Sequence, residues 1–129
     1  MKLGILGTLS LAIMLISQVA FAETVKIGFV TTLTGGAGAI GNDMRDAVEL
    51  ALDHLGRKMG GSDVKVFYED DTFKPAVGKQ KTEKLVKKDK VHFVGGYIWS
   101  HVLMASRNSV VGKGPFMISS NAGPGPVAG

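Results

Sequence analysis

Four short apolar segments alternate with longer segments of helical periodicity, and this alternation is the feature that most restricts the fold. The predicted strands are Val25–Thr31, Val64–Asp70, Val91–Gly96 and Phe116–Ser119. The predicted helices run from Asn42 or Asp43 to about Met59, from Ala76 to Asp89, and from His101 to Val111. Strands that alternate with helices form a parallel sheet with right-handed crossovers. The predicted fold class is therefore α/β, a parallel sheet with helices on both faces.

The predicted elements leave one layer incomplete. Four strands with three helices would leave one face of the sheet partly bare, whereas parallel sheets are normally covered on both faces. The residues after Asn121 read AGPGPVAG and show no helical periodicity. We therefore expect the sequence to be a truncated or partial product.

The first two predicted helices carry clear patterns. In the first, apolar residues recur at three- and four-residue spacings, and Gly60-Gly61 is expected to end the helix because glycine readily adopts the left-handed cap conformation. These apolar residues are Met44, Ala47, Val48, Ala51, Leu55 and Met59. In the second, lysines cover most of the surface, and a solvated helix face is favoured over a basic groove. These lysines are Lys79, Lys81, Lys84, Lys87, Lys88 and Lys90.

Residues 1–22 have the features of a secretory signal peptide. Lys2 gives a basic start, an uncharged apolar run follows from Leu3 to Ile16, and Ala20-Phe21-Ala22 supplies the small-residue cleavage pattern. The sequence therefore predicts cleavage after Ala22, export to the periplasm and a mature domain of residues 23–129. A membrane anchor is the alternative, because the uncharged segment approaches the ~20 residues that span a bilayer.

Composition excludes several classes of function. The chain has no cysteine, so disulfides, thiolate metal sites and a lipoprotein anchor are excluded. The formal net charge is +4, but much of the basic excess comes from the lysines of one helix. A nucleic-acid-binding face would normally interleave arginine with aromatic residues. We expect no nucleic-acid partner.

Two strand ends form the candidate ligand site. The segments VGGYIWS (Val94–Ser100) and FMISSNAGP (Phe116–Pro124) each run from a strand into a turn of small and polar residues. In open α/β sheets, ligands bind outside the carboxyl ends of strands, where strand order reverses. Ser100 would place a hydroxyl beside the free N–H groups of a helix N-terminus, which suits an anion. Simple N-capping by Ser100 is an equally good explanation of this serine alone.

Other motifs give weaker hypotheses. Gly36, Gly38 and Gly41 match the G-x-G-x-x-G dinucleotide fingerprint, but Thr32–Gly35 separate them from the strand, and the acidic run Glu69-Asp70-Asp71 lies further on than the usual spacing of about 20 residues. The histidines lack metal-ligand spacing, so no metal site is expected. The pair Ser100-His101 lacks the context of a hydrolase nucleophile. Glu69-Asp70-Asp71 is interpreted as a solvated turn rather than a cation site.

Several segments together resemble a known family. They are VKIGFVTTLTG, AIG, AVELALDHL, VFYEDD, KPAVGKQKTEKLV, HFVGGYIWS and FMISSNAGP. They are similar to the periplasmic solute-binding proteins of branched-chain amino-acid-type ABC importers, the type I, leucine/isoleucine/valine-binding-like group. That family has two α/β lobes joined by hinge strands, and the ligand is trapped between them. The resemblance implies that residues 23–129 form a partial N-terminal lobe and that the C-terminal lobe is absent.

The resemblance also implies roles for individual residues. Ser100 corresponds to the serine that grips the ligand carboxylate, and Asn121-Ala122-Gly123 corresponds to the second ligand contact. Ile40 stands where the family often has an aromatic residue that lines the ligand, and Trp99 and Tyr97 flank the serine. Members that bind α-amino acids usually carry a hydroxyl residue at the position of Gly123. The absence of this hydroxyl disfavours a ligand with an ammonium group. The segments IWSHV and SNAGP look more like a subgroup associated with aromatic or other organic acids.

The predicted function is that of a non-catalytic substrate-binding component of an ABC importer. It would capture a small apolar carboxylate, either a branched-chain amino acid or an aromatic or other organic acid, and deliver it to an inner-membrane permease. No cofactor is expected, and the full-length protein is expected to be a monomer. Because closure needs the second lobe, this chain alone should bind weakly or not at all. The alternatives are an exported dinucleotide-binding oxidoreductase domain and the ligand-sensing domain of a receptor.

Overall fold

The computed structural model describes residues 23–127, so the predicted signal peptide lies outside the described residues. The strands of this part are β1 (Val25–Thr31), β2 (Lys58–Met59), β3 (Ser62–Asp70), β4 (Phe93–Gly96) and β5 (Phe116–Met117). Its helical segments are α2 (Gly38–His54), α3 (Pro75–Lys84), the π-helical turn η1 (Leu85–Asp89), α4 (Ser100–Arg107) and the 3-10 turn η2 (Gly125–Val127). No helix in this range is both long and apolar enough to cross a membrane.

The strands form one sheet in the order β2-β3-β1-β4-β5. β1 pairs in parallel with β3 and β4, and β4 pairs in parallel with β5. The two-residue β2 runs antiparallel to β3 at the edge. The predicted α/β fold with a parallel sheet is confirmed, and β1 lies in the middle of it.

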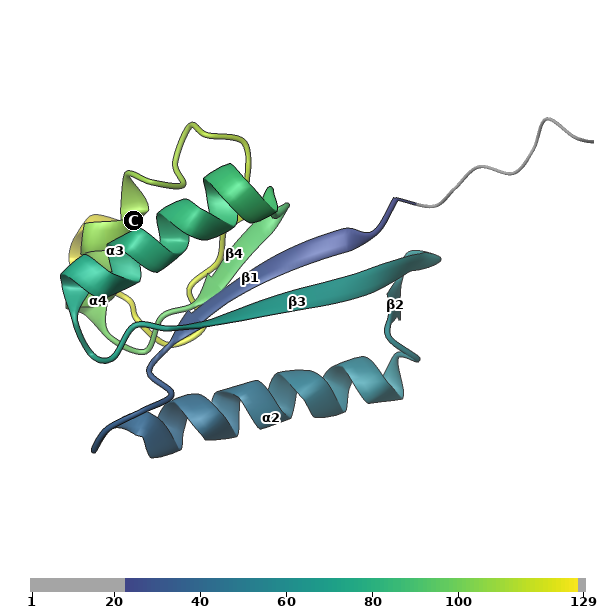
Figure 1. Ribbon diagram of the computed structural model, residues 1–129, viewed down its shortest axis with the longest axis horizontal. Coiled ribbons are helices and arrows are strands. Elements are labelled where there is room, and N and C mark those ends of the chain that lie inside the picture. Colours follow the sequence, from purple (N-terminus) through teal and green to yellow (C-terminus); the bar gives the residue numbers. More distant parts are fainter. Residues whose placement is uncertain (1–22, 128–129) are drawn as a thin grey trace, which may run out of the picture.

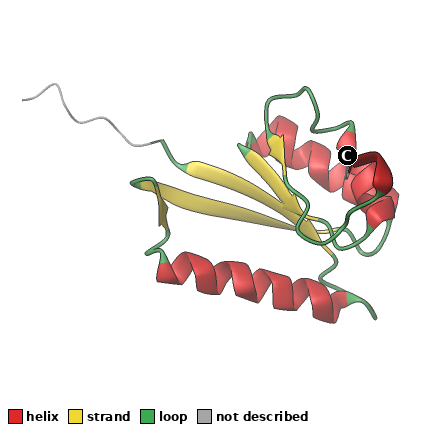
Figure 2. Cartoon of the chain, turned by 180° about the vertical axis from the view of Figure 1, so that it is seen from behind, coloured by secondary structure: helices red, strands yellow, loops and turns green. Residues whose placement is uncertain are grey.

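Helices lie on both faces of this sheet, as predicted. Figure 1 shows α2 along one face and α3 and α4 on the other, and Figure 2 shows the same arrangement from behind. Alternation along β1 divides its side chains between the two layers. Phe29 faces α2, where its ring lies 5.7 Å from that of Tyr68, while Val30 is fully buried on the side of α3 and α4. The main core cluster comprises Val30, Leu85, Val91, Val94, Tyr97, Val102, Leu103, Val110 and Ala122.

The bounds of α2 differ from the prediction at both ends. The helix begins at Gly38 and ends at His54, so it starts and stops several residues early. Gly56 and Arg57 follow with left-handed φ values of 62° and 55°, which turn the chain out of the helix. Gly60 and Gly61, with φ values of 59° and 86°, form the two-residue turn of the β2–β3 hairpin. The predicted role of this Gly-Gly pair as a helix stop is therefore wrong, because positive φ at both residues also suits a tight hairpin turn.

One part of the sheet is bare, as the imbalance of strands and helices predicts. On the face that α2 covers, the helix lies over β1 and β3 and leaves the side of β4 and β5 open. Phe116 is 70% exposed and Ile118 is 57% exposed. An apolar hollow of about 300 Å³ opens there, lined by residues that include Ile27, Phe93 and Ile118.

The lysine-rich helix is solvated, but it also covers a buried acid. Lys79, Lys84, Lys87, Lys88 and Lys90 are exposed, as predicted. Lys81 and Lys84 reach back to Glu69 on β3, and Lys81 Nζ lies 2.9 Å from Glu69 Oε2. Glu69 is 7% exposed and Asp71 is fully buried. The prediction that Glu69-Asp70-Asp71 form a solvated turn is wrong, because α3 packs over the end of β3 and encloses two of these carboxylates.

The ion pairs of Glu69 predict a pH-dependent contribution to stability. Burial raises the pKa of Glu69, but hydrogen bonds from Lys84 and Lys81 outweigh burial and hold its pKa below the ordinary value. The carboxylate therefore stabilises the fold above its unfolded-state pKa of about 4.3, and this contribution is lost as the pH falls through the lower folded-state value. We expect Glu69→Gln to lower the free energy of unfolding at pH 7 by more than it does at pH 3. Urea unfolding at several pH values measures the difference.

Asp43→Asn is the matched control for this prediction, because Asp43 is an exposed acid on α2. Its effect on stability should be small at both pH values. An equal loss of stability for Glu69→Gln at pH 7 and pH 3 would show that packing, rather than the ion pairs, accounts for the effect of the substitution.

Candidate functional site

The strand order places a topological switch point between β1 and β4. From β1 the chain passes through α2 to β3 on one side, then returns through α3 to β4 on the other side. The helices that follow β1 and β4 lie on opposite faces of the sheet (Figure 1). Ligands of open α/β sheets bind in the crevice that this divergence leaves at the carboxyl ends of the strands. The sequence predicts the ligand site at the ends of β4 and β5. In the structure, the end of β1 lies at the same edge.

The two predicted segments lie side by side at this carboxyl edge. Ser120 Oγ donates to the carbonyl of Gly96 at 3.0 Å, and Asn121 Nδ2 donates to the carbonyl of Ile98 at 3.2 Å. The backbone N–H of Ala122 donates to the carbonyl of Tyr97 at 3.0 Å. These bonds hold the loop after β5 against the loop after β4, so the two segments form one continuous surface.

Ser100 is the first residue of α4 and is exposed. The capping position is held by Trp99, whose backbone is extended and whose side chain makes no capping hydrogen bond. The first N–H groups of a helix have no acceptor within the helix, and they lie at the positive end of its dipole. Ser100 is thus not the N-cap, and its hydroxyl stands beside donors that suit a carboxylate.

Tyr97 and Ala122 face inward. Tyr97 is fully buried, its hydroxyl oxygen lies 2.7 Å from Thr82 Oγ1, and burial raises the pKa of its phenol to about 12. Ala122 is also buried in the core cluster. The Tyr97 side chain therefore packs beneath the carboxyl edge, whereas Ala122, although buried, also lines a hollow beside α4.

The other predicted residues divide between two hollows. Ile40, which is 47% exposed, and Asn121 line a hollow of about 430 Å³ over the amino end of α2. Gly123 lines a second hollow, of about 410 Å³, beside α4. An added Cβ at Gly123 would meet no atom within 4 Å. The position is therefore open to a larger side chain, and the absence of a hydroxyl there is not imposed by packing.

Trp99 contacts two residues that the sequence did not single out. Its Nε1 donates to Thr32 Oγ1 at 3.0 Å, across the switch point from β4 to the end of β1. Its ring meets that of Phe73 edge-on, with centroids 4.8 Å apart. Thr32 could have been found only from the strand order, because 67 residues separate it from Trp99.

The glycines of the G-x-G-x-x-G motif have a packing role. A Cβ at Gly38 would lie 2.7 Å from the carbonyl oxygen of Leu33, and one at Gly41 would lie 1.8 Å from that of Thr32. Gly36 has open space around it. The amino end of α2 thus packs directly on the loop after β1, and this contact accounts for Gly38 and Gly41 without a bound phosphate.

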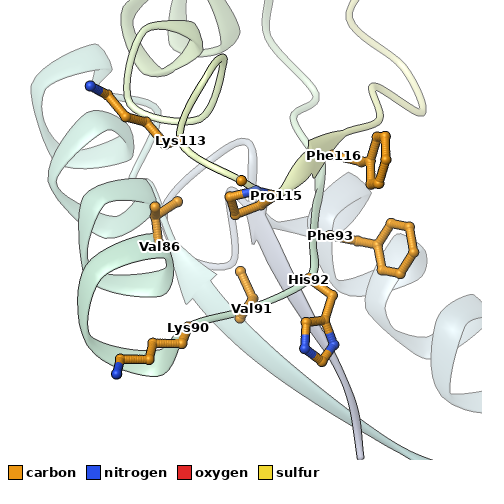
Figure 3. A pocket seen from close by; sticks show the side chains of 9 residues that line it. Val86, Lys90, Val91, His92, Phe93, Lys113, Pro115 and Phe116 are labelled. Atoms are coloured by element: carbon orange, nitrogen blue, oxygen red, sulfur yellow. The ribbon is translucent and has the colours of Figure 1, made fainter.

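A separate hollow of about 440 Å³ lies at the opposite edge of the sheet, where β4 and β5 begin (Figure 3). Lys90, Val86 and Lys113 lie on one side of it, and Val91 and Pro115 lie in the middle. The rings of Phe93 and Phe116 stack 5.9 Å apart at the other side. The hollow contains none of the predicted site residues. Among residues 23–127, no three histidine, aspartate or glutamate side chains lie close enough together to hold a metal ion.

An open parallel sheet with polar groups at the carboxyl edge of its switch point is typical of a small-molecule-binding α/β lobe. The chain belongs to the periplasmic binding protein family, whose sequence model matches residues 24–128. This match confirms the family resemblance found in the sequence.

Named relatives agree with this assignment. The Leu/Ile/Val-binding protein BraC3 from Rhizobium johnstonii is 29% identical over 114 residues, covering 84% of this chain and 31% of that protein. LivJ from Streptococcus pneumoniae, a branched-chain amino acid transporter substrate-binding protein in complex with isoleucine, is 26% identical, with a TM-score of 0.75 over 81% of this chain and 31% of that one. An ABC transporter solute-binding protein from R. palustris, in complex with benzoate, is 27% identical, with a TM-score of 0.73 over 78% of this chain and 28% of that one. The chain spans about a third of the length of the curated relatives it matches.

Proposed function

We propose that residues 23–129 supply the N-terminal lobe of a substrate-binding component of an ABC importer. The observation that carries this proposal is the exposed Ser100 at the amino end of α4, at the switch point of the sheet. A hydroxyl and the free N–H groups of a helix end together suit the carboxylate of a ligand. The protein would act in the periplasm after removal of residues 1–22, and it would pass its ligand to a membrane permease without catalysing a reaction.

The proposed ligand is a small apolar carboxylate. LivJ is in complex with isoleucine and the R. palustris protein with benzoate, and both ligands carry a carboxylate on an apolar body. Ile40 and the neighbouring Met44 offer apolar surface in the hollow that Asn121 shares. Gly123 offers no hydroxyl for an ammonium group. These features favour an aromatic or other organic acid over an amino acid.

In the proposed mechanism, this lobe holds one side of the ligand and a second lobe closes on the other. The carboxylate would bind first at Ser100, because the helix end is already formed and exposed. Closure would then exclude water and strengthen the hydrogen bonds to the carboxylate. A single lobe offers only half of these contacts, so its own affinity should be low, and the full-length protein would act as a monomer.

Nuclear magnetic resonance titration of the mature chain tests this proposal, because it detects weak binding. Benzoate is expected to shift the backbone amide resonances of Ser100 and His101, with a dissociation constant on the order of 1 mM, about 4 kcal/mol of binding free energy. Leucine should cause smaller shifts at the same amides. Larger shifts with leucine than with benzoate would overturn the preference for an organic acid.

The hydroxyl of Ser100 is tested in the same titration. Ser100→Ala should weaken benzoate binding by about tenfold, since a hydrogen bond to a charged group contributes about 1.5 kcal/mol. Ser62→Ala is the matched control, because Ser62 begins β3 at the opposite end of the strand. The site assignment fails if both variants bind benzoate as the wild type does.

A further inference from the structure

We propose that Thr32, anchored on the buried carboxylate of Asp71, is a positioning residue that holds Trp99 and Phe73 as a fixed aromatic wall at the switch point. The planar ring of an aromatic carboxylate would pack on this wall while its carboxylate meets Ser100. The part of this inference that concerns the ligand rests on the proposed function. The effect of Thr32 on Trp99 can be measured in the absence of any ligand.

The chemistry of the three side chains fixes the direction of their hydrogen bonds. The indole N–H of Trp99 can only donate, and the carboxylate of Asp71 can only accept. The Thr32 hydroxyl lies between them, 3.0 Å from Trp99 Nε1 and 2.5 Å from Asp71 Oδ1. Thr32 therefore gives its single proton to Asp71 and presents a lone pair to Trp99. The hydroxyl of Thr32 is therefore fixed in one orientation. Its lone pair in turn fixes the position of the indole N–H that donates to it.

The same carboxylate holds the second aromatic residue. Asp71 Oδ1 accepts the backbone N–H of Phe73 at 2.8 Å, and Asp70 Oδ1 accepts that of Thr72 at 2.9 Å. Thr72 and Phe73 both have left-handed φ values, 50° and 62°, which are unfavourable for residues other than glycine. Two carboxylates thus maintain a strained turn whose result is to direct the Phe73 ring toward Trp99.

The aromatic residues form a cluster over the ends of β3, β1 and β4. The rings of Phe73 and Trp99 meet at 83°, and His101 meets Phe73 at 5.0 Å and 87°. Phe73 is nevertheless 48% exposed, and its neighbour His101 is also exposed. Edge-to-face aromatic pairs that keep open surface can accept a further ring. Ser100 lies between Trp99 and His101 in the chain, so the anion-binding donors adjoin this surface.

Stability alone does not explain this arrangement. Asp71 is fully buried, and its second oxygen, Oδ2, has no hydrogen-bond partner among the described residues. An unsatisfied buried carboxylate oxygen destabilises a fold. This destabilising group lies beside the switch point, where Asp71 also orients Thr32 and the turn at Phe73. Such a cost is understandable where it positions groups that act on a ligand.

Trp99 is the single tryptophan of the chain, so fluorescence excited at wavelengths that tyrosine does not absorb reports on this wall alone. Thr32→Val keeps the shape of the side chain but removes the hydroxyl, and we expect greater quenching of Trp99 by acrylamide and a weaker near-ultraviolet circular dichroism signal. Thr32→Ser keeps the hydroxyl and should restore both signals. Thr24→Val is the matched control, because Thr24 precedes β1 at the end of that strand opposite Thr32. Far-ultraviolet circular dichroism confirms that each variant is folded.

Benzoate binding provides the second measurement. Thr32→Val should bind benzoate on the order of fivefold more weakly than wild type and Thr24→Val, because an indole that is no longer held must be ordered when the ligand binds. If Thr32→Val leaves the quenching of Trp99 unchanged, the positioning role is overturned. If quenching rises while benzoate affinity is unchanged, the indole does not form the ligand wall. If the wild type binds neither benzoate nor leucine, the proposed function fails, and the quenching result still decides whether Thr32 positions Trp99.

Discussion

Replacing Gly41 with alanine is expected to destabilise the fold by about 3 kcal/mol or more. Alanine is intrinsically the better helix former by about 1 kcal/mol, so propensity alone predicts the opposite sign. Gly41 lies inside α2, but its added Cβ would stand 1.8 Å from the carbonyl oxygen of Thr32 and 3.0 Å from Thr31 Oγ1. The clash involves backbone, which cannot rotate away. The helix would have to move off the end of β1, and urea unfolding would measure the loss.

Gly36→Ala is the matched control in the same glycine motif. Gly36 has no atom within 4 Å of an added Cβ. Its substitution should therefore change stability by less than about 0.5 kcal/mol, as for other exposed positions. Equal stabilities of Gly36→Ala and Gly41→Ala would contradict the close packing of α2 on Thr32. Loss of stability confined to Gly41→Ala would show that the motif serves packing.

Much of the fold follows from local sequence, and the errors lie where local rules compete. The predicted strands and helices all occur, because β-branched runs and helical periodicity are strong signals over these lengths. The end of α2 is wrong because Gly56 and Gly60-Gly61 offer two stops in close succession. The buried state of Glu69 is also unpredictable from the chain order, since it arises when Lys81 and Lys84 of α3 cross over β3.

The site is less predictable than the fold because its groups converge only through strand order. Ser100 and Asn121 stand at strand ends that the sequence identifies, and the structure places both at the carboxyl edge. The relation of Thr32 and Asp71 to Trp99 requires β1 to lie between β3 and β4. No periodicity within a segment contains that information.

The inward direction of Tyr97 has a backbone cause. Gly96 and Tyr97 have consecutive positive φ values, 100° and 47°, at the end of β4. Two such residues break the regular inward and outward alternation of strand side chains. The alternation along β4 therefore does not predict which way the side chains after Gly96 face. The sequence therefore predicted a loop after β4 but not which of its side chains point outward.

Replacing Tyr97 with alanine is expected to lower the free energy of unfolding by about 4 kcal/mol, the usual cost of truncating a buried aromatic residue. Tyr97 is fully buried among Val30, Leu85 and other core residues. The Thr82 hydroxyl already donates to the carbonyl of Gly78 at 2.8 Å, so the phenol of Tyr97 must be the donor to Thr82. Tyr97→Phe removes only that bond and should lower the free energy of unfolding by about 1 kcal/mol.

The other tyrosine of the chain gives the matched comparison. Tyr68 is partly buried, and its hydroxyl donates to Glu49 Oε1 at 2.7 Å on the α2 side of the sheet. Tyr68→Ala should therefore lower the free energy of unfolding by less than Tyr97→Ala, since less apolar surface is lost from the core. Because Tyr97 faces the core, Tyr97→Phe should leave benzoate binding by the mature chain unchanged. If Tyr97→Phe instead weakens benzoate binding and leaves the free energy of unfolding unchanged, the phenol faces the ligand and Trp99 does not form the wall alone.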